Sequence, residues 1–116
     1  MIVKNDSVFL RHILDAIKRV EKYLSDVSES AFDQDSLLQD GIIRQIEIIG
    51  EATKNISTMT RNKYRKVPWK DMAGMRDKLI HGYFGVDINA VWETAQKDIP
   101  VLKILIKKIL KDYPID

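Results

Sequence analysis

The chain has 116 residues, of which 31 % are charged and 45 % hydrophobic, and its formal net charge is +2. This length suits one core, so we expect residues 1–116 to form a single domain. The lack of cysteine excludes disulfides, thiolate catalysis and cysteine-ligated zinc. His12 and His81 are far apart and no metal-binding loop pattern accompanies them, so neither a metal site nor another cofactor is expected.

The chain shows no feature of a membrane or secreted protein. No apolar run approaches the roughly 20 residues that span a bilayer. The first residues enter an amphipathic pattern directly, without the apolar segment of a signal peptide. We therefore expect a cytoplasmic protein without a membrane partner.

The first two expected helices follow from apolar residues at helical spacing. Asn5 or Asp6 is the expected cap of the first helix, and His12 borders its apolar stripe as a partly buried residue with one hydrogen bond. That stripe consists of Phe9, Ile13, Ala16, Ile17, Val20 and Leu24. A polar loop over 28–36 should end at a cap formed by Asp33, Asp35 or Ser36.

The second helix, from about Ser36 to Ile56, carries a wide apolar arc and two glycines. The centre of the arc is Ile42, Ile46, Ile49, Ala52 and Ile56. Gly41 and Gly50 each weaken a helix by about 1 kcal/mol relative to alanine. We expect them to allow the close approach of another backbone, either within the bundle or across a dimer.

The C-terminal half predicts further helices separated by proline and glycine. The third helix should start near Trp69 or Asp71, after Pro68, and end before Gly82. Asp87 is the expected cap of the fourth helix, and Pro100 either begins a fifth helix or kinks a long fourth one. Together these segments predict an all-α, up-down bundle of four to five helices.

The connector before the third helix is basic and contains aromatic residues. Its cations are Arg61, Lys63, Arg65, Lys66 and Lys70, and Tyr64 and Trp69 lie among them. Basic residues that alternate with aromatics suit a phosphate backbone with stackable bases, so this stretch is a candidate RNA contact. The alternative is a solvated connector between two helices.

The spacing Arg76-x4-His81-x-Tyr83 is the strongest chemical signal in the chain. Arginine holds phosphate, and histidine transfers protons near neutral pH, so the pair can cleave RNA without a metal. On an ideal helix Arg76 and His81 lie about 140° apart around the axis. Either the helix end unwinds to turn His81 inward, or two chains place their motifs side by side.

This motif resembles the signature of the HepT-like branch of the HEPN superfamily, small all-helical ribonucleases that act as toxins in prokaryotic toxin–antitoxin pairs. Three further segments carry the resemblance: Ile49-Gly50-Glu51-Ala52, the run from Val67 to Arg76, and the run from His81 to Asp87 followed by Val91-Trp92. The resemblance implies a HEPN-like fold and a homodimer with a composite cleft between two motif helices. It also implies that a cognate minimal nucleotidyltransferase, the antitoxin, attaches AMP to Tyr83.

The motif leads to specific expectations for its residues. Arg76 and His81 are the expected catalytic residues of an endoribonuclease acting on tRNA or mRNA, Lys78 is a further phosphate contact, and Asp77 supports Arg76. The structural alternative pairs Arg76 with Asp71 or Asp77 and makes His81 a helix cap. Two other functions remain open: a non-catalytic partner or substrate-binding module for a minimal nucleotidyltransferase, and a plain helical interaction protein.

Overall fold

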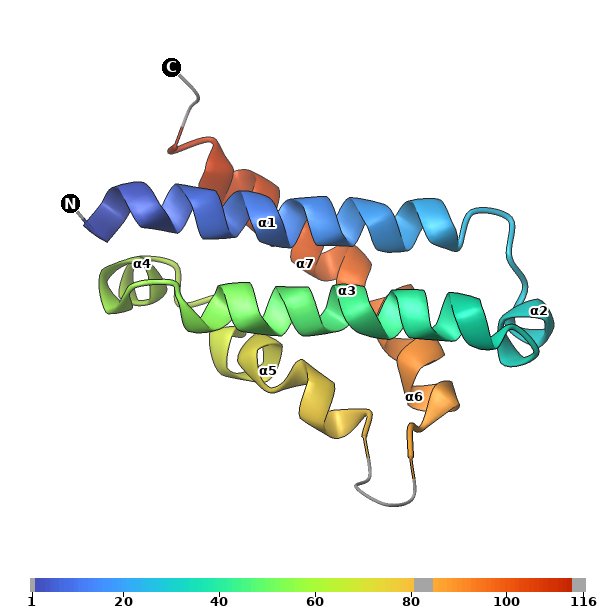
Figure 1. The fold of residues 1–116 in the computed structure, drawn as a ribbon. Coiled ribbons are helices and arrows are strands. Elements are labelled where there is room, and N and C mark those ends of the chain that lie inside the picture. Colours follow the sequence, from blue (N-terminus) through green and yellow to red (C-terminus); the bar gives the residue numbers. More distant parts are fainter. Residues whose placement is uncertain (1, 81–84, 114–116) are drawn as a thin grey trace.

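The computed structural model describes residues 2–80 and 85–113, with side chains described for 6–80 and 85–113. The described chain is helical, which confirms the all-α class (Figure 1). Its elements are α1 (Ile2–Tyr23), α2 (Glu29–Asp33), α3 (Ser36–Lys54), α4 (Thr58–Lys63), α5 (Trp69–Ala73), the 3₁₀ helix η1 (Met75–Lys78), α6 (Ile88–Glu93), the π-helical turn η3 (Thr94–Asp98) and α7 (Ile99–Leu110). The extended pairing in these ranges is an isolated bridge between Ile80 and Val86.

The expected helices correspond to the longer parts of this series. The first two are α1 and α3, the third is α5 followed by η1, and the last is the run from α6 to α7. The short helices α2 and α4 lie in segments that the sequence suggested were connectors. Within the described ranges, no helix is both long and apolar enough to cross a membrane.

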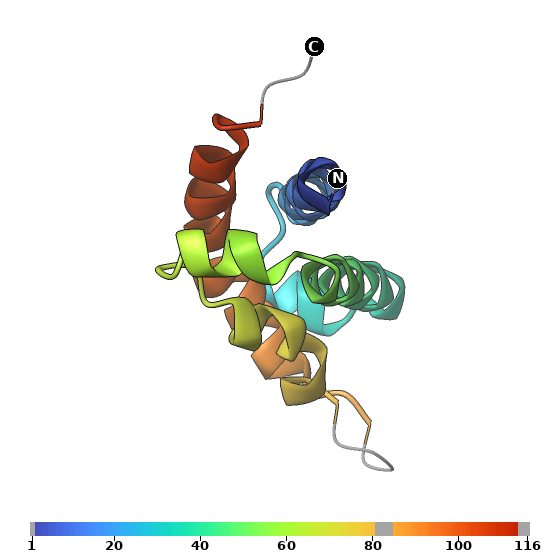
Figure 2. The same ribbon diagram turned by 90° about the vertical axis from the view of Figure 1, so that its left-hand side faces the viewer.

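Two long antiparallel helices form the centre of the fold. Figure 1 shows α1 and α3 side by side, with α7 crossing behind them and α5 beneath α3. Figure 2 shows the same arrangement along α1 and α3, with α4 lying between α3 and α7. The antiparallel bridge between Ile80 and Val86 brings the chain that follows η1 next to the chain that precedes α6.

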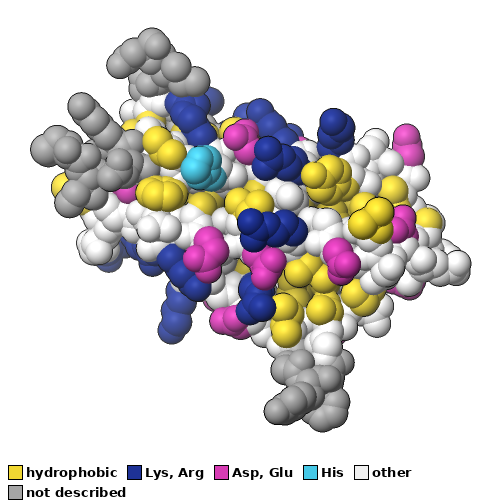
Figure 3. All heavy atoms as spheres, in the orientation of Figure 1, with side chains coloured by type: hydrophobic (Ala, Val, Ile, Leu, Met, Phe, Trp, Pro, Cys, Tyr) yellow, Lys and Arg dark blue, Asp and Glu magenta, His cyan; other side chains and the backbone are white. Residues whose placement is uncertain are grey.

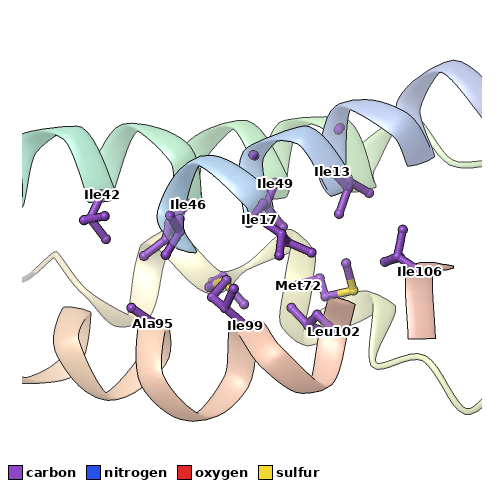
Figure 4. Packing of buried hydrophobic residues seen from close by; sticks show 14 of the residues in the cluster. Ile13, Ile17, Ile42, Ile46, Ile49, Met72, Ala95, Ile99, Leu102 and Ile106 are labelled. Atoms are coloured by element: carbon purple, nitrogen blue, oxygen red, sulfur yellow. The ribbon is translucent and has the colours of Figure 1, made fainter. Parts of the chain in front are cut away.

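The apolar stripes of these helices meet in one core (Figure 4). Ile13 and Ile17 of α1 and Ile46 of α3 are fully buried, as the helical spacing predicted. The run from α6 to α7 adds Ala95, Ile99, Leu102 and Ile106, and α5 adds Met72. Burial of these stripes fixes which side of α3 faces the core.

Two predicted helix caps are confirmed and one is wrong. The carboxylates of Asp35 and Asp87 accept hydrogen bonds at 3.0 Å from the backbone N–H groups three residues later. Asp6 does not cap α1, because α1 begins at Ile2 and Asp6 is fully buried within it. Its carboxylate instead accepts hydrogen bonds from Ser57 N, Ser57 Oγ and Thr60 Oγ1, at 2.9, 2.6 and 2.5 Å.

Pro100 both follows a helix irregularity and stands near the start of α7. The turn η3 widens to π geometry over Thr94–Asp98, directly after α6 and directly before α7. Proline has no N–H to donate to a preceding carbonyl, and such a gap in the ladder favours a local π turn. Helix α7 therefore begins at Ile99 without a break in the chain's helical path.

Candidate functional site

The motif arginine lies on the 3₁₀ helix η1 and is tied to α3. Arg76 Nε donates to Glu47 Oε2 at 2.7 Å, and the Arg76 side chain remains 49 % exposed. Nη1 lies 3.9 Å from Asp77 Oδ1, which is beyond hydrogen-bond range. Glu47 thus holds one edge of the guanidinium in place, while about half of the Arg76 side chain stays exposed.

Gly50 brings η1 and α3 close enough for that ion pair. A Cβ at Gly50 would lie 3.3 Å from the backbone carbonyl oxygen of Ala73 and 3.5 Å from that of Met72. The expected close approach of a backbone at Gly50 is therefore confirmed, and it occurs inside the bundle. Because Glu47 precedes Gly50 by three residues, it lies on nearly the same side of α3 and reaches the segment that follows Ala73.

Sequence reasoning missed Glu47 as part of the site. The signal was a carboxylate inside the apolar run Ile46-Glu47-Ile48-Ile49. A charged residue there needs a partner or solvent, and its side chain is only 29 % exposed. The sequence offered Asp71 and Asp77 as structural partners of Arg76, but the close partner comes from another helix.

The charges around the described part of the motif nearly cancel. Lys78 Nζ lies 3.9 Å from Asp71 Oδ1, and Arg76 has Glu47 and Asp77 as neighbours. Two cations therefore face three carboxylates. Figure 3 shows the side formed by α1 and α3, where Lys/Arg and Asp/Glu side chains are likewise interspersed.

A hollow of about 240 Å³ lies beside the motif segment. Asp71 and Lys78 line it from α5 and η1, while Thr94 and Asp98 line it from the π turn and Val101 from α7. The hollow therefore combines charged groups with an apolar floor on the side of η1 that faces the C-terminal helices.

His81 and Tyr83, together with Gly82, lie outside the described residues. The predicted catalytic role of His81 and the predicted modification of Tyr83 stay predictions. The predicted end of the third helix at Gly82 is wrong, because η1 ends at Lys78 and Ile80 is already paired in an extended bridge. The described chain ends at Ile80 and resumes at Gly85, with Ile80 paired to Val86. The segment that carries His81 and Tyr83 thus connects the two halves of this bridge.

The basic connector is partly used by the fold itself. Arg61 donates from Nη2 to Thr53 O at 2.7 Å and from Nε to Ile56 O at 3.2 Å, so its guanidinium caps the end of α3. Trp69 is 6 % exposed and its indole N–H donates to Tyr64 O at 3.0 Å, so its ring is not available for stacking on a base. The exposed cations of this stretch are Lys63, Arg65, Lys66 and Lys70.

Tyr64 is the aromatic residue of the connector that reaches the surface. Burial first, and then its hydrogen bond to the Asp112 carboxylate, raise the pKa of Tyr64 to about 12. Lys63 Nζ lies 5.4 Å from the centroid of the Tyr64 ring, a cation–π geometry. Tyr64 therefore stays protonated and fixed against the C-terminal segment at neutral pH.

Comparisons with known proteins identify the family. The sequence model described as "Ribonuclease HepT-like" matches residues 13–109. The chain is 44 % identical to "Putative RNase" of Caldanaerobacter subterraneus subsp. tengcongensis over 94 % of its own length and 97 % of that protein. It is 43 % identical to "Probable ribonuclease HepT" of Thermococcus cleftensis, over 89 % and 94 % of the two chains.

A further relative is about twice as long as this chain. It is the Methanocaldococcus jannaschii protein named "Gamma-glutamylcyclotransferase and putative RNase", which is 49 % identical over 94 % of this chain but only 49 % of its own length. This chain thus spans about half of that relative. No solved structure matches. The extent of the family match and the identities over nearly the full chain show that this protein belongs to the HepT-like ribonuclease family.

Proposed function

We propose that this protein is a metal-independent endoribonuclease and the toxin of a toxin–antitoxin pair. Family membership and the relatives' names support the ribonuclease activity. The observation that carries the proposal is the geometry of Arg76, whose Nε is anchored by Glu47 while half of the side chain stays accessible. An anchored guanidinium with accessible N–H groups is suited to hold the nonbridging oxygens of a phosphodiester.

The proposed reaction is transesterification of RNA. His81 takes the proton of a ribose 2′-hydroxyl, whose oxygen forms a bond to the adjacent phosphorus. The bond from phosphorus to the 5′-oxygen breaks, and a second histidine protonates that oxygen. Arg76 stabilises the charge that grows on the nonbridging oxygens. The products are a 2′,3′-cyclic phosphate and a 5′-hydroxyl on tRNA or mRNA fragments.

A homodimer supplies the second histidine in this proposal. Membership of the HepT-like family supports it, because the family resemblance implies a cleft between two copies that each contribute one motif. Helix geometry no longer bears on it, since η1 ends at Lys78, before His81. Sedimentation of the purified protein tests this arrangement. We expect a dimer, and a stable, fully active monomer would contradict it.

The proposed antitoxin is a minimal nucleotidyltransferase that adenylylates Tyr83. An AMP group beside Arg76 would occupy the cleft and place a phosphate on the cation that RNA needs. Incubation with the partner enzyme and ATP should add one adenylyl mass to the peptide that contains Tyr83, as read by mass spectrometry. A Tyr83→Phe variant should remain unmodified, and modification at another residue alone would contradict the assignment.

The decisive experiment compares variants on bulk tRNA and mRNA in the presence of EDTA. Arg76→Ala and His81→Ala should abolish cleavage, whereas the control Arg19→Ala, which changes an exposed arginine of α1, should leave it intact. End analysis should find cyclic phosphates. If no RNA is cut, or all variants cut equally well, the protein is instead a partner module of the nucleotidyltransferase.

A further inference from the structure

The charge balance at the motif leaves open what attracts RNA to it. Three carboxylates surround the two cations at Arg76 and Lys78, so this region exerts little long-range pull on a polyanion. Proteins that bind single-stranded nucleic acids owe much of their affinity to lysines and arginines that line a groove and contact the phosphates. A strongly basic surface elsewhere on the fold would supply what the motif lacks.

Such a surface lies where the end of α4 meets α7. A groove of about 360 Å³ is lined by four cations: Lys63, Arg65 and Lys66 from the connector, and Lys108 from α7. None of the nine described residues that line it is acidic. The nearby Asp112 carboxylate is engaged by the hydroxyl of Tyr64.

The floor of this groove is apolar. Val67, Leu105 and Ile109 line it between the cations, and Leu105 is only partly buried by the fold. A rim of cations over an aliphatic floor suits a nucleotide, whose base needs apolar contact and whose phosphate needs charge. The volume falls within the range of sites that hold small ligands, roughly 300 to 1,000 Å³.

A second hollow adjoins this groove on the side of α5. It is lined by Arg65 and Val67, which also line the groove, and by Lys70 and Asp71 of α5. Asp71 in turn lines the hollow beside Lys78. Figures 1 and 2 show α5 between α4 and η1, so a strand that leaves the groove can follow α5 toward Arg76.

We propose that the groove between the end of α4 and α7, centred on Lys66 and Lys108, is an RNA exosite that holds single-stranded RNA away from the cleavage motif. The proposal rests on the proposed ribonuclease function and adds a binding site to it. Lys108 carries the new assignment, because it comes from a helix outside the motif and the connector. The exosite captures the RNA, and Arg76 acts on a phosphodiester further along the strand.

The test measures binding and cleavage separately. A 2′-O-methyl oligonucleotide of about a dozen residues, which cannot undergo the cleavage reaction, is titrated by fluorescence anisotropy at several salt concentrations. Lys108→Glu should weaken binding about tenfold and lower the salt slope by about 0.7. The matched control is Lys107→Glu, which reverses the neighbouring exposed lysine of α7 that does not line the groove, and its affinity should change less than about twofold. Equal effects of the two variants would overturn the exosite.

Two further arms test the occupant and the link to cleavage. An abasic oligonucleotide with the same phosphates should bind wild-type protein more weakly; equal binding would reduce the groove to a phosphate contact and overturn the proposal.

A dinucleotide has one phosphodiester and cannot occupy both sites. Lys108→Glu should therefore cut the dinucleotide at the wild-type rate, while its kcat/KM for long RNA falls about tenfold. Loss of dinucleotide cleavage in Lys108→Glu would contradict a separate exosite. If wild-type protein cuts neither substrate, the proposed ribonuclease function fails while the binding results still decide the exosite.

Discussion

The substitution Glu47→Ala should lower the thermal stability of the protein only slightly but slow RNA cleavage strongly. The Arg76–Glu47 ion pair has side chains that are 49 % and 29 % exposed, so solvent screens it and it contributes less than about 1 kcal/mol to folding. For a domain of this size that corresponds to a fall in Tm of no more than about 6 °C in Glu47→Ala. A thermal melt followed by circular dichroism measures this small effect.

The same substitution should cost far more in cleavage. Without the hydrogen bond to Nε at 2.7 Å, the Arg76 side chain samples other rotamers, and misplacement of such a group by about 1 Å costs on the order of a hundredfold in rate. We therefore expect kcat for RNA cleavage to fall about a hundredfold in Glu47→Ala. Glu47→Gln should recover most of the rate, because the amide oxygen still accepts from Nε.

Two controls decide whether Glu47 acts through Arg76. Glu51→Ala removes a carboxylate one turn further along α3, which is paired with Lys54 at 3.3 Å, and should leave cleavage unchanged. In the Arg76→Ala background, Glu47→Ala should cause no further loss of any residual cleavage or of RNA affinity, since Glu47 acts through Arg76. Cleavage that is unchanged or faster in Glu47→Ala would show that the carboxylate only neutralises Arg76, and would refute positioning.

Three further predictions concern the scaffold. Gly41→Ala should stabilise the protein by about 0.5 to 1 kcal/mol in urea unfolding, because alanine favours a helix and its Cβ would lie in ordinary contact, 3.8 Å from the Tyr23 ring. Gly50→Val should destabilise it by about 2 kcal/mol, because the Cβ would lie only 3.3 Å from the backbone carbonyl oxygen of Ala73 in α5. The same sign for both would contradict the packing at α3. Asp6→Ala should cost about 3 kcal/mol in the same assay, since it removes the buried acceptor shared by two donors of half-buried Ser57 and the hydroxyl of buried Thr60. A cost below about 0.5 kcal/mol, which is typical of surface substitutions, would contradict this network. Because the pKa of Tyr64 is raised to about 12, the contribution of Tyr64 to folding stability is complete below about pH 10 and is lost as the pH rises toward 12. Asp112→Asn should lower that pKa, so that tyrosinate absorbance develops at lower pH. An unchanged titration would show that Asp112 does not hold the Tyr64 proton.

Local patterns in the sequence determined the longer helices and several of their ends. The spacing of Ile42, Ile46 and Ile49 placed the buried side of α3, because a helix repeats every 3.6 residues whatever it packs against. Asp35 and Asp87 were recognisable as caps, since a cap bonds an N–H only three residues away. The motif and its family resemblance likewise depend on short spacings, and the family assignment is confirmed.

The tertiary structure alone decided which distant side chains meet. Asp6 was a plausible cap by its position, but its actual partners lie more than fifty residues away in α4 and the residue before it. The pairing of Arg76 with Glu47 and the grouping of Lys108 with Lys66 join segments whose separation leaves no trace in local periodicity. These contacts depend on how α3, α5 and α7 pack. Burial of the apolar stripes fixes the positions of the helices, and those positions decide which charged side chains lie near one another.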